Sequence, residues 1–286
     1  MTLADIQTIT PALRQWIIEQ ARAGHRPEAV LEAMKGSGWR EDVALEALET
    51  VLSGVLQPNA QASVLPPPSR VPEPALDGSP ATLRAHDREV RIVMSLREPR
   101  VVVFSGLLSD AECDEMVALA GARLQRSHTV DTSTGDSEIN DARTSDGMFF
   151  TRAEHPVCAL LEARIAALLS WPVENGEGLQ VLRYRPGAEY KPHYDYFDPA
   201  QPGTPSILER GGQRVATILT YLNTPTRGGG TTFPEVNLEI AAQKGCAVFF
   251  SYDRPHPMTR SLHGGAPVHE GEKWVATKWL RVDRFD

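Results

Sequence analysis

Hydrophobic residues recur at helical spacing near the start of the chain. Thr10 precedes Pro11 in the way that an N-cap residue precedes a proline at the first helical position. Two further helical patterns begin at Pro27 and near Glu41, and a glycine follows each of the first two patterns. We therefore expect residues 1–56 to form a small all-α module, a bundle of three helices.

A proline-rich stretch follows this module. Seven of the 24 residues from Gln57 to Pro80 are proline, and three of these prolines are consecutive. Such a composition favours a stiff, extended conformation. We expect residues 57–84 to be a linker between two independently folded domains.

From residue 85 onwards the pattern changes from helices to strands. Ser109 and Glu112 fit a capping box at the start of one helix, and Pro156 begins a second one. After Leu179 the sequence consists of short strand-like runs separated by turns. Helices followed by many strands indicate a mainly β domain over residues 85–286, a sandwich or barrel with flanking helices.

Two polar segments rich in turn residues interrupt this domain. They span residues 127–147 and 198–212, and the second is rich in proline and glycine. Long loops in compact domains often cover a binding site. We expect both segments to be loops that close over a substrate.

The charge and hydropathy of the chain argue against nucleic acid and membranes as its binding partners. The chain has 286 residues and a formal net charge of -8, which gives it no general attraction to nucleic acid or to anionic membranes. No apolar run reaches the length of a membrane span, and the N-terminus lacks the pattern of a signal peptide. We expect a cytoplasmic protein that binds neither nucleic acid nor membranes.

The candidate chemistry is concentrated around His193 and Asp195. Residues two apart on a strand point to the same side, so this imidazole and this carboxylate face one point. Two histidines and one carboxylate with open positions form the Fe(II) site of non-haem oxygenases. We select His263 as the third ligand because it lies where a short extended run meets a Gly-Gly turn.

Lys273 follows His263 by ten positions and opens an alternating strand pattern. A buried ammonium group is costly unless an anion pairs with it. The pattern therefore predicts an anionic ligand near the metal site. Read alone, a His-x-Asp triplet is more often a surface pair than a metal site, and it is the combination with His263 and Lys273 that favours a metal.

Five segments of the chain, taken together, resemble prolyl 4-hydroxylases of the Fe(II)/2-oxoglutarate dioxygenase superfamily. The resemblance extends in order over roughly residues 98–284. The segments are DARTSDGMF (residues 141–149), EGLQVLRY (177–184), HYDYF (193–197), GGQRVAT (211–217) and HGGAPVHEGEKWVATKW (263–279).

This resemblance implies a double-stranded β-helix, or jelly roll, with the catalytic site in its mouth. It implies that His193, Asp195 and His263 bind Fe(II). It also implies that 2-oxoglutarate pairs with Lys273 and accepts hydrogen bonds from the hydroxyl groups of Tyr184 and Thr231. The cosubstrates and cofactors that it implies are O2, 2-oxoglutarate, Fe(II) and ascorbate.

The implied reaction is hydroxylation of a peptidyl proline at C4, with decarboxylation of 2-oxoglutarate to succinate. The resemblance implies that Tyr190, Arg214 and Trp279 surround the proline ring, with Arg143 nearby on the first loop. Aromatic walls and a donor to a backbone carbonyl suit such a substrate, although a tryptophan in a strand is equally consistent with ordinary core packing. The implied partner is a proline-containing protein or peptide.

Two other hypotheses remain at this point. The same iron chemistry could act on another protein side chain or on a free amino acid, or the domain could be a catalytically silent scaffold. The module at residues 1–56 resembles ubiquitin-associated three-helix modules, with Met34 to Trp39 at the position of the binding loop. This resemblance implies a protein partner, and the alternative is an appendage for dimerisation or solubility.

Overall fold

A computed structural model of the chain describes residues 10–22, 25–56, 65–127, 129–130, 137–138 and 143–286. The chain divides into two compact units, with the boundary between Leu65 and Pro66. Each unit has a hydrophobic core of its own. The two units are described separately below.

The first unit contains the three predicted helices, α1 (Pro11–Arg22), α2 (Pro27–Gly36) and α3 (Glu41–Leu56). The Oγ1 of Thr10 accepts a hydrogen bond of 3.2 Å from the backbone N–H of Leu13, as expected for an N-cap residue. Ile17, Met34 and Leu48, one from each helix, lie in a shared buried cluster. The apolar positions of the sequence pattern therefore face one another.

The predicted linker is shorter than its composition indicated. Residues 57–64 lie outside the described residues, but the second unit begins at Pro66, well before the expected boundary at residue 85. The backbone N–H of Ser69 donates to the carbonyl of Asp253 at 2.6 Å, and that of Glu73 donates to Leu169 at 3.2 Å. Because these hydrogen bonds and apolar contacts fix the segment, it belongs to the second unit.

The N-terminal half of the second unit contains the helices that flank the sheets. Ser109 forms both hydrogen bonds of the predicted capping box with Glu112 at the start of α4. The elements are β1 (Thr82–Ala85), β2 (Arg88–Leu96), β3 (Arg100–Ser105), α4 (Asp110–Gly121), β4 (Gln125–Arg126), β5 (Thr129–Val130), β6 (Ser137–Glu138), β7 (Asp146–Phe150) and α5 (Pro156–Leu169).

The C-terminal half is built mainly from strands, as predicted. Its elements are η1 (Val173–Asn175), β8 (Leu179–Tyr184), β9 (Tyr190–His193), α6 (Thr204–Leu208), β10 (Arg214–Tyr221), β11 (Arg227–Gly228), β12 (Thr231–Phe233), η2 (Pro234–Val236), β13 (Leu238–Ile240), β14 (Ala247–Ser251), η3 (Pro257–Thr259), β15 (His263–Gly265), β16 (Val268–Glu270) and β17 (Lys273–Arg281).

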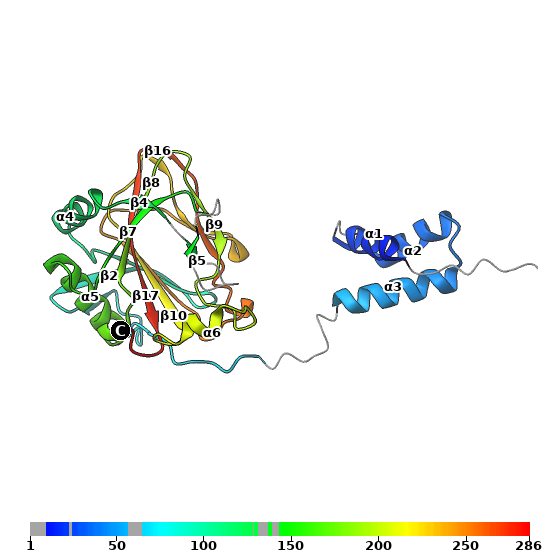
Figure 1. Cartoon of the computed structure of the whole chain (residues 1–286), viewed down its shortest axis with the longest axis horizontal. Coiled ribbons are helices and arrows are strands. Elements are labelled where there is room, and N and C mark those ends of the chain that lie inside the picture. Colours follow the sequence, from blue (N-terminus) through cyan, green and yellow to red (C-terminus); the bar gives the residue numbers. More distant parts are fainter. Residues whose placement is uncertain (1–9, 23–24, 57–64, 128, 131–136, 139–142) are drawn as a thin grey trace, which may run out of the picture. The chain divides into compact units, whose positions relative to one another are not determined.

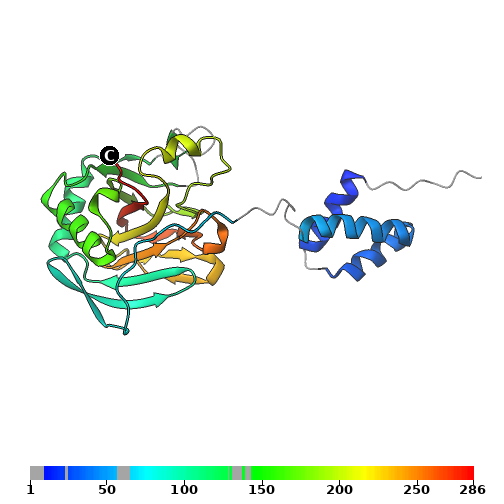
Figure 2. The ribbon, with the colours of Figure 1, turned by 90° about the horizontal axis from the view of Figure 1, so that it is seen from below.

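The strands form two main antiparallel sheets between which the chain alternates. Within the described residues the large sheet has the order β1-β2-β3-β14-β10-β17-β8-β7-β4, and the small sheet has the order β13-β12-β15-β9. From β8 onwards the chain passes repeatedly between the two sheets, as in a double-stranded β-helix, while β11 and β16 pair in a sheet of their own. Figures 1 and 2 show the two sheets of this unit and the helices on its outer side.

Two hydrophobic cores lie on opposite faces of the large sheet. One core packs α4 and α5 against the outer face, with Met116, Leu161 and Phe249 among its members. The other lies between the two sheets and includes Phe233 and Phe250. The helices therefore support the large sheet from outside and leave its inner face to form the site.

Only parts of the two predicted loops agree with the structure. The strand β7 begins at Asp146, inside the first predicted loop, whereas residues 128, 131–136 and 139–142 lie outside the described residues. The second predicted loop contains the short helix α6. No helix within the described residues combines the length and apolar character required to cross a membrane.

Candidate active site

The two histidines of the site face each other across the small sheet. Strand β9 pairs with β15 so that His193 lies directly opposite His263, and their ring centroids are 4.4 Å apart. Asp195 follows the end of β9 by two residues. Strand pairing therefore brings together two ligands that are far apart in the sequence.

Hydrogen bonds to backbone carbonyl groups determine which ring nitrogen of each histidine carries the proton. The Nδ1 of His193 lies 2.9 Å from the carbonyl oxygen of Lys191, and the Nδ1 of His263 lies 2.9 Å from that of Ser261. A carbonyl oxygen can only accept a hydrogen bond, so each Nδ1 carries the proton. Each Nε2 is left with a lone pair, and each lies 3.5 Å from a carboxylate oxygen of Asp195.

Asp195 is held in place by a buried chain of two hydroxyl groups. The Oγ1 of Thr217 donates to the Oδ2 of Asp195 at 2.6 Å, and the hydroxyl of Tyr252 lies 3.0 Å from the same Oγ1. Because Thr217 uses its proton on Asp195, Tyr252 is the donor to Thr217. The chain fixes one carboxylate oxygen and leaves the other toward His193.

These three side chains fit a metal ion. One ligand atom from each of His193, Asp195 and His263 lies within 4.8 Å of the others. Burial lowers the pKa of His263 to about 4, so its ring is neutral at pH 7, as a ligand must be. Burial alone would raise the pKa of Asp195, but the adjacent His263 and His193 outweigh burial and hold this pKa below its usual value.

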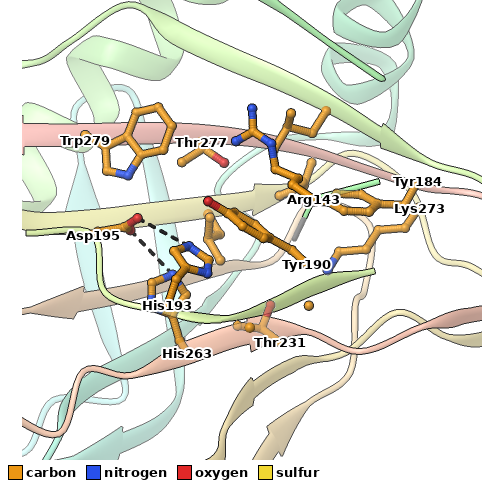
Figure 3. Close-up of a pocket in the computed structure, with 15 residues that line it drawn as sticks. Arg143, Tyr184, Tyr190, His193, Asp195, Thr231, His263, Lys273, Thr277 and Trp279 are labelled. Atoms are coloured by element: carbon orange, nitrogen blue, oxygen red, sulfur yellow. Dashed lines mark ion pairs between the residues drawn. The ribbon is translucent and has the colours of Figure 1, made fainter. Parts of the chain in front are cut away.

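A cavity of about 40 Å³ lies beside this cluster, and all three side chains of the cluster line it. Strand β17 lines it with alternate residues, namely Lys273, Val275, Thr277 and Trp279. Lys273 and Trp279 lie toward opposite ends of the cavity, and Tyr190 lies between them (Figure 3). Six residues of strand separate these two ends, or roughly 20 Å.

Lys273 is a buried cation at one end of the cavity. Its side chain forms no ion pair with any of the described residues, and its residue is only 4% exposed. The ammonium group lies 5.4 Å and 5.7 Å from the ring centroids of Tyr184 and Tyr221. Burial lowers the pKa of Lys273 to about 8. An anionic ligand would supply the partner that the protein does not.

Tyr184 and Thr231 lie at the same end of the cavity as Lys273. Tyr184 pairs with Lys273 in the register of β8 and β17, and burial raises the pKa of its phenol to about 12, so the hydroxyl keeps its proton. The Oγ1 of Thr231 shares a hydrogen bond of 2.7 Å with the hydroxyl of Tyr221. Both residues therefore line the part of the cavity next to Lys273.

Tyr190 and Arg143 form one side of the cavity. The ring of Tyr190 stacks on His193 at 3.7 Å between centroids, and the guanidinium of Arg143 lies 5.2 Å from the Tyr190 ring. Arg143 forms an isolated β-bridge with Tyr190 and is buried. The structure therefore places Arg143 in the wall of the cavity.

Trp279 lies at the end of the cavity away from Lys273. Its residue is 7% exposed, and its Nε1–H has no hydrogen-bond acceptor among the described residues. The guanidinium of Arg214 stacks on the Trp279 ring at 4.0 Å. A buried donor without an acceptor is unusual in a folded protein.

Arg214 does not line the cavity, although the sequence predicted contact with substrate. Its guanidinium forms two hydrogen bonds with the buried carboxylate of Glu177, at 2.7 Å and 2.9 Å. Arg281 donates to the same carboxylate at 2.6 Å. In this structure Arg214 therefore supports Trp279 from behind.

Comparison with known proteins agrees with this geometry. The sequence model of the 2OG-Fe(II) oxygenase superfamily matches residues 179–281. Prolyl 4-hydroxylase 2 of Arabidopsis thaliana is 41% identical over 214 residues, which cover 66% of this chain and 69% of the relative. Prolyl 4-hydroxylase 1 of the same plant is 43% identical over 201 residues, with 64% and 69% covered. The chain belongs to the prolyl 4-hydroxylase family.

Among solved structures, the chain is similar to the viral collagen prolyl hydroxylase vCPH from Paramecium Bursaria Chlorella virus-1, in its complex with 2-oxoglutarate. The identity is 31%, the TM-score is 0.49, and the match covers 63% of this chain and 95% of that one.

As a member of the prolyl 4-hydroxylase family, the chain is a 2-oxoglutarate-dependent dioxygenase. The family uses Fe(II), 2-oxoglutarate, O2 and ascorbate, as the resemblance in the sequence implied. The predicted jelly roll is likewise confirmed. The residues that fit Fe(II) are His193, Asp195 and His263, which the structure brings together as predicted.

The sequence did not reveal the residues that support this centre. Thr217, Tyr252 and Glu177 contact the predicted residues, but each comes from a strand or loop whose pairing the sequence does not specify. Thr217 is a polar residue in the apolar run of β10. This was the feature of the sequence that could have indicated a supporting role. A buried hydroxyl in such a strand requires a polar partner.

Proposed function

We propose that this enzyme hydroxylates peptidyl proline at C4 and converts 2-oxoglutarate to succinate in the same reaction. The observation that carries the proposal is that a buried cation, a metal-binding cluster and a tryptophan whose N–H has no acceptor among the described residues all line the same cavity. Lys273 lies toward one end, Trp279 toward the other, and the cluster of His193, Asp195 and His263 also lines it. This arrangement supports a cosubstrate and a substrate that meet beside the same metal.

Lys273 binds the distal carboxylate of 2-oxoglutarate in this proposal. The ammonium group is buried and has no carboxylate partner among the described residues, so a dianionic ligand compensates the cost of burial. Tyr184 and Thr231 add hydroxyl groups beside it. The ligand is thereby oriented with its keto acid end toward the histidines.

Fe(II) bound at this centre would couple the decarboxylation of 2-oxoglutarate to oxidation of a C–H bond, chemistry that no side chain supplies. The protein contributes the neutral Nε2 atoms of His193 and His263 and the ionised carboxylate of Asp195. Thr217 holds that carboxylate in one orientation. The mostly buried lining restricts the access of water to the reacting groups.

Tyr190 and Trp279 form the proline side of the cavity in this proposal. Both rings offer apolar surface to a pyrrolidine ring, and the Nε1–H of Trp279 is available to a backbone carbonyl. Arg143 supplies further donors beside Tyr190. The Nε1–H of Trp279 suits a peptide, which brings carbonyl oxygens on both sides of its proline. The relatives named prolyl 4-hydroxylases from Arabidopsis thaliana support this choice of target.

Competition between free proline and a proline-containing peptide tests the choice of target. The enzyme is incubated with Fe(II), 2-oxoglutarate, O2 and ascorbate, and hydroxyproline is quantified in both substrates. We expect hydroxylation of the peptide at concentrations at which free proline is untouched. Equal rates would contradict a peptide substrate, and oxygen on a different side chain would show that the chemistry is assigned correctly but its target is not.

We also infer that the N-terminal helices bind a protein partner. They form a compact unit with its own hydrophobic cluster, and Leu45 on α3 is 44% exposed. None of the residues that the structure describes in this unit lines the catalytic cavity. Capture of a partner by residues 1–65 alone, lost on Leu45→Asp, would support the inference, and capture by residues 66–286 instead would contradict it.

A further inference from the structure

The inner face of the large sheet continues beyond the catalytic cavity. Strands β17, β8, β7 and β4 are consecutive at one end of this sheet (Figure 1). Thr277 of β17 pairs with Gln180 of β8, and Gln180 pairs with Phe149 of β7. Directly paired residues point to the same side of a sheet, so Phe149 points to the side of Thr277, which lines the cavity.

Phe149 is an exposed aromatic residue on this face. It is 51% exposed, whereas its neighbours Met148 and Phe150 are buried in the core beneath the helices. An isolated exposed phenylalanine needs no explanation, but this ring lies on the same continuous surface as a substrate cavity. Continuity with the cavity is what distinguishes it from other exposed apolar side chains such as Val93.

Gly178 lies next to both β17 and β7. The preceding residue, Glu177, donates its N–H to the carbonyl of Trp279 at 3.0 Å, which places Gly178 beside β17. A Cβ atom on Gly178 would lie 2.6 Å from the carbonyl oxygen of Phe150 and 3.9 Å from Cδ1 of Phe149. The glycine therefore lets its backbone approach that of β7 closely, and Gln180, two residues further on, pairs with both Thr277 and Phe149.

The spacing of the two rings matches an extended peptide. Phe149 is two strands away from Trp279 and displaced by two residues along the strand direction, which gives roughly 12 Å between their backbones. A polyproline II chain advances about 3.1 Å per residue. A peptide whose target proline lies at Trp279 would therefore reach Phe149 with a residue about three or four positions away.

We propose that Phe149 is an outer subsite that binds an apolar residue of the peptide, three or four positions from the target proline. This proposal rests on the proposed function, because it assumes a peptide substrate. Gln180, whose amide oxygen accepts a hydrogen bond of 3.4 Å from Arg143, lies between the strands of Trp279 and Phe149 on the same inner face. The enzyme then favours substrates with apolar residues, such as further prolines, at that spacing.

The test compares Phe149→Ala with the unaltered enzyme on two substrates. One is a tripeptide with proline at its centre, and the other is a proline-rich peptide long enough to reach Phe149. We expect the variant to raise KM for the long peptide by about tenfold, as for a well-placed aromatic contact, and to leave the tripeptide and 2-oxoglutarate unchanged. Phe149→Leu should restore most of the loss, and Val93→Ala, at another exposed apolar position, should have no effect.

Direct binding gives a second readout that is independent of turnover. Fluorescence anisotropy of the labelled long peptide, with 2-oxoglutarate and Zn²⁺ in place of Fe(II), should show the same weakening for Phe149→Ala. An aspartate scan of the peptide should remove the difference between the two enzymes only at positions three or four residues from the proline. Equal affinity of both enzymes for the long peptide would overturn the subsite, whereas failure of the unaltered enzyme to hydroxylate either substrate would overturn the proposed function itself.

Discussion

Thr217 donates a 2.6 Å hydrogen bond to Asp195, and both side chains are buried. The two residues come from different sheets, because Thr217 lies on β10 and Asp195 follows β9. The hydrogen bond fixes the carboxylate in an orientation in which the Nε2 of each histidine lies 3.5 Å from one of its oxygens. Partners of this kind orient metal ligands and adjust their basicity.

We predict that Thr217→Val weakens binding of a divalent metal by about ten- to a hundredfold. Valine has a similar shape but lacks the donor, so the packing of β10 is largely kept. Thr217→Ser retains the hydroxyl and should bind metal nearly normally. Calorimetric titration with Co²⁺ measures both affinities, and a Thr217→Val variant with unaltered affinity would show that the hydrogen bond does not position Asp195.

A second prediction concerns Lys273. Lys273→Met removes a charge-assisted contact and should weaken 2-oxoglutarate binding by about 1.5 to 3 kcal/mol, or roughly one to two powers of ten. Metal binding should be retained, because Lys273 is not one of the three ligands. Titration of each variant with Co²⁺ and then with 2-oxoglutarate separates the two effects. Unchanged affinity for 2-oxoglutarate would remove Lys273 from the cosubstrate site.

The affinity for 2-oxoglutarate should also depend on pH. Burial lowers the pKa of Lys273 to about 8, so the free enzyme loses this positive charge as the pH rises through about 8. Binding of an anion then requires uptake of a proton, and affinity should fall with increasing pH above that value. The residual binding of Lys273→Met should lack this dependence. A flat profile for the unaltered enzyme between pH values below and above 8 would contradict the assignment.

A fourth prediction concerns the buried carboxylate of Glu177, which compensates the charges of Arg214 and Arg281. Glu177→Gln leaves two buried guanidinium groups without this anion and should lower the free energy of unfolding by about 3 to 5 kcal/mol. Urea denaturation at pH 7 measures the loss. A loss below about 1 kcal/mol would show that solvent already screens the cluster.

The same carboxylate gives the stability a pH dependence of known sign. Burial alone would raise the pKa of Glu177, but Arg214 and Arg281 outweigh burial and hold the pKa below its usual value of 4.5. The unfolded chain therefore binds the proton more readily, so this contribution is present above pH 4.5 and is lost as the pH falls below it. The unfolding free energy of Glu177→Gln should decline less over that range.

The positions of the metal ligands were predictable because strand periodicity is local. His193 and Asp195 are two residues apart, and their common direction follows from the strand alone. The third ligand had to be selected from histidines far away in the sequence, and His263 was selected because of the motif around it. The register that sets it opposite His193 depends on the pairing of β9 with β15, which the sequence does not specify.

Two features of the structure could not be predicted from the sequence, and for the same physical reason. The linker was placed too far along the chain because proline composition does not show which segment packs against a folded surface, as residues 69 and 73 do. The contact of Arg214 with substrate stays a prediction, but its ion pair with Glu177 could not be foreseen from its motif. Both outcomes depend on contacts between residues far apart in the sequence.

The N-terminal unit should be dispensable for chemistry. None of its described residues lines the cavity, so removal of residues 1–65 should leave kcat on a short proline peptide within about twofold. The same deletion should abolish binding of any partner that residues 1–65 capture. A large fall in kcat on short peptides would mean that the helices contribute to catalysis.

The central claim is that the cavity couples 2-oxoglutarate to hydroxylation of peptidyl proline. Mass spectrometry of a proline-containing peptide after incubation with the enzyme, Fe(II), 2-oxoglutarate, ascorbate and isotopically labelled O2 tests it most directly. We predict one labelled oxygen on proline C4 and one in succinate, and neither product with His193→Ala. Labelled succinate with an unmodified peptide under all conditions would contradict the claim.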